Sequence, residues 1–198
     1  MTVYDELFIK FVKKELKRNG IDCILTKGKT VKCEGALVGG YFSDSEKKLV
    51  CATGRCFNDW FAVFVHEYSH YTQWKDNCKP WSDVGNSLDI MWNWLNNKDY
   101  PNINKHIDKC KNLELDNEKR SVQLIKDFNL SLNIPIYIKK ANAYIYFYNY
   151  MKITRRWVKK GKSVYNNNNI LKYMPDTFRA SYKRLPKKIE KVFVQEEI

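Results

Sequence analysis

The residues best suited to chemistry are the two histidines and the glutamate of the sequence HEYSH, at positions 66–70. In a helix, His66 and His70 lie one turn apart on the same face, so both imidazoles can bind one metal ion. Glu67 lies beside them, where its carboxylate can act as the general base that activates a water molecule. The spacing therefore predicts a metal site with His66 and His70 as ligands and Glu67 as the catalytic residue. The alternative is a pair of core histidines that hydrogen-bond to each other or to the backbone.

A zinc site needs a third protein ligand, and its best source is the sequence NLELDNEKRSVQLIKDF at residues 112–128. On a helical wheel the apolar residues of this segment share a face with Glu114 and Glu118, whereas Asp116 falls on the opposite side. A carboxylate on an apolar face needs a counterion or a metal ion. We prefer Glu118 as the third ligand because it lies one turn deeper in the helix, and Glu114 then orients a histidine. The reverse assignment is the alternative.

Two other residues are less suitable as ligands. Asp76 follows the motif at a distance where some HExxH enzymes place a ligand, but Gln73 occupies the position of the glycine that would turn the chain back. The helix therefore continues, and it directs Asp76 about 120° away from His70. His106 lies in a stretch rich in Pro and Asn, and we expect it at the surface.

The elements that position these residues follow from the hydrophobic pattern and from the residues that interrupt it. Strands are expected at residues 23–26, 31–42 and 48–53. The polar sequence SDSEK should join the last two as an antiparallel hairpin. Helices are expected over the first 20 residues, at 59–75, 88–95, 113–128 and 139–160, and in one or two short turns around Pro175 and Pro186. Apart from the helix at 88–95, residues 81–112 are expected to be irregular, and 166–169 to be a loop.

Composition restricts the class of protein and the compartment. The 198 residues are 44% hydrophobic and 15% aromatic, which is enough for a core and excludes wholesale disorder. Uncharged apolar runs fall well short of the roughly 18 residues of a membrane span, so no membrane partner is expected. The first 20 residues lack the pattern of a secretion signal, and the 6 cysteines are therefore expected to be reduced thiols. These features together predict a cytoplasmic protein.

A hairpin, a helix with HEYSH and a later helix with an acidic ligand resemble a minimal gluzincin-type zinc metallopeptidase domain. The arrangement is similar to the ImmA/IrrE-like proteins and to small HExxH proteins of phage type. The resemblance covers about residues 30–130 and rests on HEYSH and on LELDNEKRSVQLI. The family's E-A-x-x-F-A pattern of small residues is absent from the second helix, which leaves the identity of the third ligand open.

The resemblance implies a fold, a cofactor and an activity. The fold is α+β: a mainly helical zincin-like domain with a small antiparallel β-hairpin or sheet and a basic helical C-terminal extension. The whole chain, residues 1–198, would form a single domain, with the extension at about 131–198. The activity is that of a zinc metallopeptidase, a hydrolase in which Glu67 activates water for attack on a peptide bond. One Zn²⁺ per chain would be held by His66, His70 and Glu118, with Glu114 as the alternative third ligand.

The expected substrate is a peptide or a protein. An extended peptide is expected to bind by strand addition to Lys48–Thr53, the strand expected nearest to the HEYSH helix. Tyr144 and Tyr148 are candidate donors to the oxyanion. The alternative is that these two aromatic residues, one helical turn apart, only pack in the core.

Positive charge is concentrated in the C-terminal part of the chain. Residues 1–118 hold 17 basic and 17 acidic side chains, and residues 119–198 hold 18 basic and 5 acidic ones, so the whole net charge of +13 lies in the second segment. This asymmetry predicts weak binding of polyanions or nucleic acid, unless the charge only keeps the surface soluble. The alternative function is that of a nucleic-acid-associated binding protein whose metal site is structural or vestigial.

Overall fold

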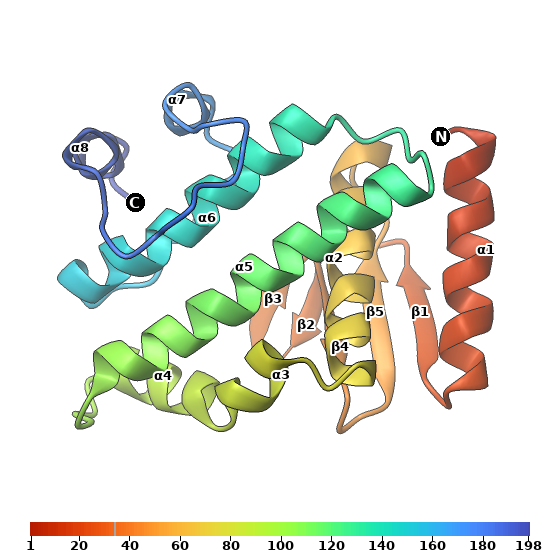
Figure 1. The fold of residues 1–198 in the computed structure, drawn as a ribbon, viewed down its shortest axis with the longest axis horizontal. Coiled ribbons are helices and arrows are strands. Elements are labelled where there is room, and N and C mark those ends of the chain that lie inside the picture. Colours follow the sequence, from red (N-terminus) through yellow and green to blue (C-terminus); the bar gives the residue numbers. More distant parts are fainter. Residues whose placement is uncertain (34) are drawn as a thin grey trace. The chain divides into compact units, whose positions relative to one another are not determined.

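The structure, a computed structural model, describes residues 1–33 and 35–198 (Figure 1). The chain divides into two compact units. Unit 1 comprises Met1–Cys78 and Asn117–Asn133, and unit 2 comprises Lys79–Asp116 and Ile134–Ile198. The sequence predicted a single domain with a basic extension from about residue 131. The structure divides the chain differently, because the C-terminal residues build the core of unit 2 together with Lys79–Asp116.

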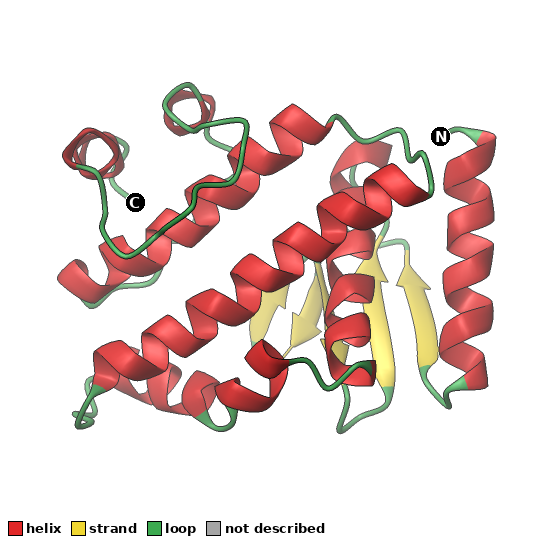
Figure 2. Ribbon diagram, viewed as in Figure 1, coloured by secondary structure: helices red, strands yellow, loops and turns green. Residues whose placement is uncertain are grey.

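Unit 1 contains the HEYSH helix and all of the described strands, which are yellow in Figure 2. Its elements are α1 (Val3–Arg18), β1 (Asp22–Thr26), β2 (Val31–Cys33), β3 (Ala36–Val38), β4 (Gly40–Ser43), β5 (Lys48–Ala52) and α2 (Phe57–Lys75). The end of the long helix α5 (Ile103–Asp127), from Asn117 onward, also belongs to this unit. The helix predicted at 59–75 is therefore confirmed as α2.

The sheet of unit 1 has the strand order β1-β5-β4. β5 pairs in parallel with β1 and antiparallel with β4, so the hairpin predicted across SDSEK is confirmed for β4 and β5. The single strand predicted over 31–42 is wrong: β2 and β3 pair with each other as a separate hairpin. Gly35 lies between them with φ +87°, a conformation that permits the tight turn.

The position of β5 also corrects the predicted substrate strand. Both edges of β5 are occupied, by β1 on one side and β4 on the other. Strand addition needs an edge with unpaired backbone groups, so a peptide cannot add to Lys48–Thr53 as predicted. β4 is an edge strand of this sheet, and it packs against the HEYSH helix α2, as β5 does.

The core of unit 1 fixes α2 by aromatic packing. Phe8 of α1 is fully buried, and its ring meets those of Phe61, Phe64 and Tyr68 of α2 edge-on, with centroids 5.7 to 6.3 Å apart. Edge-to-face contacts of this kind add to the hydrophobic gain of burial. The predicted first helix is confirmed as α1, and its end is marked by Gly20, which has φ +68°.

Unit 2 is helical in all of its described elements. These are α3 (Lys79–Val84), α4 (Ser87–Leu95), the beginning of α5, α6 (Ile134–Thr154), α7 (Asn168–Leu171) and α8 (Lys187–Gln195). α7 and α8 pack on α6, and the segment between them crosses α6 in Figure 1. The irregular region predicted at 81–112 is wrong, as is the loop at 166–169, part of which is α7. Pro101 and Asn102 mark the start of α5, and Asn102 has φ +57°.

The fold is α+β and mainly helical with a small sheet, as the sequence predicted. The sheet is mixed and not purely antiparallel, because β1 joins it in parallel. Among the described residues, no helix combines the length and the apolar character needed to cross a membrane.

Candidate metal centre

α2 places the two histidines of HEYSH on one face, as their spacing predicted. The ring centroids of His66 and His70 lie 4.8 Å apart and the ring planes are at 86°. Both side chains are half-buried. Two imidazoles at this separation can both bind the same metal ion.

α5 lies against this face of α2 and is joined to it by polar contacts. The Asn117 side-chain amide donates to the His66 carbonyl oxygen (3.2 Å), and Ser69 Oγ donates to the Asn117 carbonyl oxygen (3.0 Å). Ser69 and Asn117 are both fully buried. α5 runs without a break through both units, and the boundary between them falls between Asp116 and Asn117 within this helix.

The third carboxylate near the histidines is Glu114. Ligand atoms of His66, His70 and Glu114 all lie within 4.8 Å of one another, and no other metal-type cluster of three occurs in the part of the chain that the structure describes. Glu118 lies one turn further along α5, and its Oε1 is 3.3 Å from Nδ1 of His66. The geometry thus favours the alternative assignment, with Glu114 as ligand and Glu118 as the residue that orients His66.

Each histidine has side-chain partners at Nδ1. Nδ1 of His66 lies 3.3 Å from Oε1 of Glu118 and 3.0 Å from Nδ2 of Asn117, and Gln73 Oε1 lies 2.9 Å from Nδ1 of His70. An imidazole that donates from Nδ1 carries its lone pair on Nε2, the nitrogen then suited to bind a metal. Burial, together with the neighbouring His66, lowers the pKa of His70 to about 3, so this imidazole is neutral at neutral pH.

Glu67 is buried beside the histidines and faces β4. Its side chain is 8% exposed, and its carboxylate accepts a hydrogen bond from the backbone N–H of Phe42. Burial raises the pKa of Glu67, although nearby His66 and the hydrogen bond from Phe42 act to lower it. A carboxylate with a raised pKa is better matched to accepting a proton at neutral pH than an exposed one.

Gly40 permits the close approach of β4 to α2. A Cβ atom at this position would lie 2.8 Å from the Val50 carbonyl oxygen, 2.9 Å from a methyl carbon of Val63 and 3.2 Å from Cγ of Glu67. Only glycine fits this position without a shift of the backbone. The strand that holds Glu67 in place therefore depends on a residue without a side chain.

The candidate oxyanion donors lie on α6, in unit 2. Tyr148 is 1% exposed, its hydroxyl lies 3.3 Å from that of Tyr144, and it interacts electrostatically with Glu114. Burial raises the pKa of Tyr148 well above its ordinary value, so it remains a neutral hydroxyl. The contact between the two tyrosines is also what core packing would give, and their catalytic role stays a prediction.

The two residues that the sequence disfavoured as ligands have other partners. Asp76 is paired with Arg120 at 2.7 Å. His106 Nδ1 lies 3.0 Å from the hydroxyl of Ser87, in unit 2. His106 is half-buried, not at the open surface as predicted.

Sequence reasoning missed the two amide residues that position the histidines. Gln73 was considered only for the glycine it replaces, although a residue three positions after His70 lies on the same helix face. Asn117 stands between the two candidate glutamates, three residues after Glu114, and its burial could have been inferred from that spacing. A polar residue next to a metal motif at helical spacing is thus a usable signal.

No family model, no curated protein and no solved structure matches this chain. The arguments for a metal centre therefore come from its own residues.

Proposed function

We propose that this protein is a zinc-dependent metallopeptidase with Glu67 as its general base. The observation that carries the proposal is the cluster of His66, His70 and Glu114 next to the buried carboxylate of Glu67. Two neutral imidazoles and one carboxylate form a donor set that zinc takes in catalytic sites, where a fourth position is left for water or substrate. The acceptor at Nδ1 of His70 and the neutrality of this ring at neutral pH fit this donor set.

The residues of the site have distinct roles in the proposed reaction. A bound zinc ion would supply Lewis-acid activation of water and of the scissile carbonyl. Glu67 accepts the proton of the attacking water and passes it to the leaving amine. The Phe42 N–H holds Glu67 in position, and Glu118 and Gln73 hold the two rings.

The substrate in this proposal is an extended peptide that adds to the edge of β4. This strand pairs with β5 on one side only, in the described part of the sheet. Its Phe42 N–H contacts Glu67, so a peptide along the same edge would bring a carbonyl close to the general base. We place the activity in the cytoplasm, where buried thiols such as Cys51 and Cys110 stay reduced.

Exchange of Glu67 for glutamine tests the proposal. Glu67→Gln should retain zinc but reduce the hydrolysis of labelled casein by at least about a hundredfold, because an amide cannot accept the proton. Glu46→Gln, at an exposed glutamate of the same unit paired with Lys48, is the matched control and should keep full activity. Undiminished turnover in Glu67→Gln would contradict the mechanism.

The alternative, a structural or vestigial metal site in a nucleic-acid-associated protein, predicts a different pattern. In that case the unmodified protein would bind zinc but would not hydrolyse casein. Glu67→Gln would show the same zinc content and the same lack of hydrolysis. The buried position of Glu67 beside the ligands favours the enzyme. A carboxylate that serves neither metal nor catalysis is costly to bury there.

A further inference from the structure

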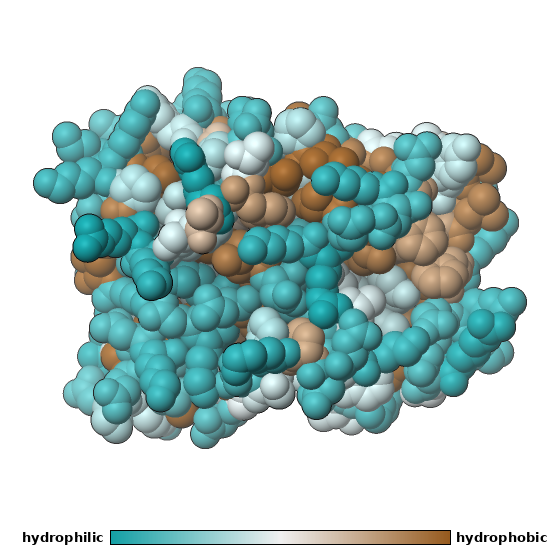
Figure 3. Space-filling view, viewed as in Figure 1, coloured by the Kyte–Doolittle hydropathy of each residue, from teal (hydrophilic) through white to brown (hydrophobic). Residues whose placement is uncertain are grey.

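Residues 172–191, which we call the basic segment, carry a dense set of exposed cations. The exposed basic side chains are Lys172, Arg179, Lys183, Arg184, Lys187, Lys188 and Lys191. The acidic residues of the segment are Asp176, which is exposed, and Glu190, which is half-buried. Figure 3 shows hydrophilic side chains next to pale and hydrophobic ones in the part of this face where the segment runs.

Buried side chains of α6 hold the backbone of the basic segment. Asn142 Nδ2 donates to the carbonyl oxygens of Pro175 (2.8 Å) and Thr177 (3.1 Å), and Asn149 Nδ2 donates to that of Tyr182 (2.8 Å). Tyr182 is itself buried, and its hydroxyl donates to Asn142. Because these groups face inward, the backbone is fixed and the cations between them are directed to solvent.

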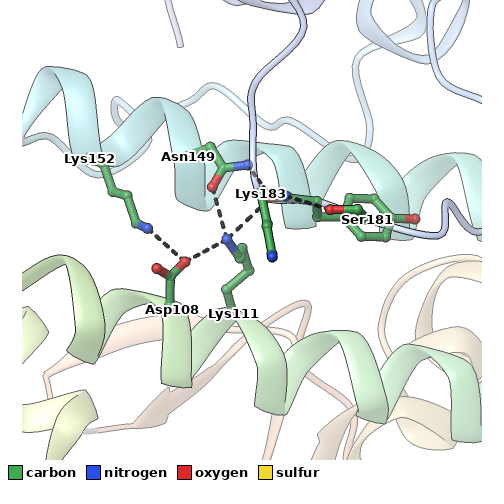
Figure 4. A network of polar contacts seen from close by, with 7 residues as sticks. Asp108, Lys111, Asn149, Lys152, Ser181 and Lys183 are labelled. Carbon is green, nitrogen blue, oxygen red and sulfur yellow. Dashed lines mark hydrogen bonds and ion pairs between the residues drawn. The ribbon is translucent and has the colours of Figure 1, made fainter.

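Two lysines beneath the segment share one carboxylate (Figure 4). Lys111 and Lys152 each place Nζ 2.6 Å from Oδ1 of Asp108. Lys111 also donates to the carbonyl oxygen of Tyr182 (3.3 Å), so Lys111 lies directly under the backbone of the segment. Two positive charges with one negative charge leave a net positive charge below a surface that is already cationic.

α8 continues the same pattern at its start. Lys187, Lys188 and Lys191 are exposed, and they lie on the face opposite to the buried residues Ile189, Val192 and Phe193. The helix therefore presents its cations as one group.

From this arrangement we infer that the basic segment binds the phosphate backbone of nucleic acid without reading its sequence. A fixed row of lysines and arginines supplies the charge that phosphate contacts require. An anionic bilayer fits less well, because the only large hydrophobic side chain exposed among the segment's described residues is Tyr173, and peripheral helices need several. Tyr173 has Lys188 Nζ 4.8 Å from its ring centroid, which combines an aromatic face with a cation as single-strand binders do.

The test uses the full-length protein, because the C-terminal residues cannot be removed without loss of the unit 2 core. Binding of a fluorescent 30-base-pair DNA duplex and of a single-stranded RNA of equal length is measured across a salt gradient. The variant Lys183→Glu/Arg184→Glu/Lys187→Glu should bind at least about tenfold more weakly, and its log–log salt slope on duplex DNA should fall by about 2 to 3 units. The companion variant with glutamine at the same positions should lower the slope similarly. Because it introduces no negative charges, it separates the loss of phosphate contacts from misfolding caused by charge repulsion.

The matched control is Lys13→Glu/Lys14→Glu/Lys17→Glu, which makes the same charge change at exposed residues of α1 in unit 1. It should keep most of the affinity and the salt slope. Glu67→Gln should bind as the unmodified protein does, so this inference stands or fails separately from the peptidase. Three outcomes would overturn it: no binding at low salt, an equal loss in both triple variants, or tighter binding to phosphatidylserine vesicles than to either nucleic acid. Preference for RNA or for DNA would identify the source of the phosphate.

Discussion

The two imidazoles of the candidate centre are positioned from different helices. Nδ1 of His66 contacts Glu118 and Asn117 of α5, and Nδ1 of His70 contacts Gln73 of its own helix α2. Acceptors at Nδ1 fix both the tautomer and the ring orientation, and their loss weakens metal binding without removal of a ligand. The strength of zinc binding should therefore depend on residues that do not touch the ion.

The two glutamates of α5 should differ in their effect on zinc affinity. Glu114→Gln removes a ligand, and we expect it to weaken zinc binding more than Glu118→Gln, which should cost about 10- to 100-fold. Competition with a chromophoric chelator measures both constants. If Glu118→Gln is the more damaging change, the original preference for Glu118 as ligand is right and the assignment from geometry is wrong.

Gln73 should affect zinc binding only through the orientation of the His70 ring. Gln73→Ala removes the acceptor at Nδ1, and the zinc affinity should fall by about 10- to 100-fold because the ring loses its fixed orientation. Gln123→Ala is the control, since Gln123 is exposed on α5 and contacts Asp127. Equal affinities in the two variants would show that Gln73 does not position the ring.

The sequence was sufficient to predict that His66 and His70 share one face of α2, because the i, i+4 spacing depends only on helix geometry. It was not sufficient for the choice between Glu114 and Glu118. Both glutamates lie on the same face of α5, and a helical wheel contains no information about where along its axis one helix meets another. Such a choice depends on tertiary packing.

At the level of elements, the contact between β4 and α2 determines where Glu67 lies. Gly40→Ala places a methyl group against the Val50 carbonyl oxygen and the Glu67 side chain. We expect a loss of about 1–3 kcal/mol of stability and a clear fall in peptidase activity. Thermal unfolding and casein hydrolysis measure the two effects.

Gly39→Ala is the matched control for this change. Its Cβ would meet only the side chain of Val63, at 3.2 Å, which can move. Its effect should be smaller in both measurements. An unchanged activity in Gly40→Ala would mean that the close approach of β4 is not needed for the reaction.

Asp5 joins the start of α1 to the chain that follows α5. It accepts hydrogen bonds from Thr2 and from Ser131, whose N–H and hydroxyl lie 2.9 and 2.8 Å from its carboxylate oxygens. Burial alone would raise the pKa of Asp5, but these hydrogen bonds outweigh it and lower the pKa. The ionised form therefore stabilises the folded state.

Asp5→Asn should lower the free energy of unfolding by about 1–3 kcal/mol at pH 7. Because the folded-state pKa is below the unfolded value of about 4, the contribution is complete above pH 4 and is lost as the pH falls through the lowered pKa. The difference between the variant and the unmodified protein should thus shrink in acid. Urea unfolding at pH 7 and at pH 3 measures it, and a difference that grows on acidification would contradict the account.

The elements of unit 1 were more predictable than those of unit 2. α1, β5 and α2 carry regular apolar patterns with clear ends, such as Gly20 after α1. In unit 2 the start of α5 was placed about ten residues too late, because Pro101 and Asn102 were taken as signs of an irregular segment. The same residues are common directly before a helix, so local composition alone does not separate the two cases.

On the scale of the whole molecule, α5 is shared between the two units. Glu114 lies before the boundary within this helix, and Asn117 and Glu118 lie after it. The charge is distributed unevenly along the chain: residues 134–198, all in unit 2, hold 15 basic and 4 acidic side chains. The candidate metal centre and the basic segment are formed by different residues, and each has its own test.

The central claim is that His66 and His70 bind zinc, and metal analysis tests it most directly. Purified full-length protein, loaded with zinc and then dialysed, is examined by inductively coupled plasma mass spectrometry. The account predicts about one zinc ion per chain, almost none in His66→Ala or His70→Ala, and full content in His106→Ala, whose histidine contacts Ser87 instead. A zinc-free unmodified protein, or full zinc content in either motif variant, would contradict it.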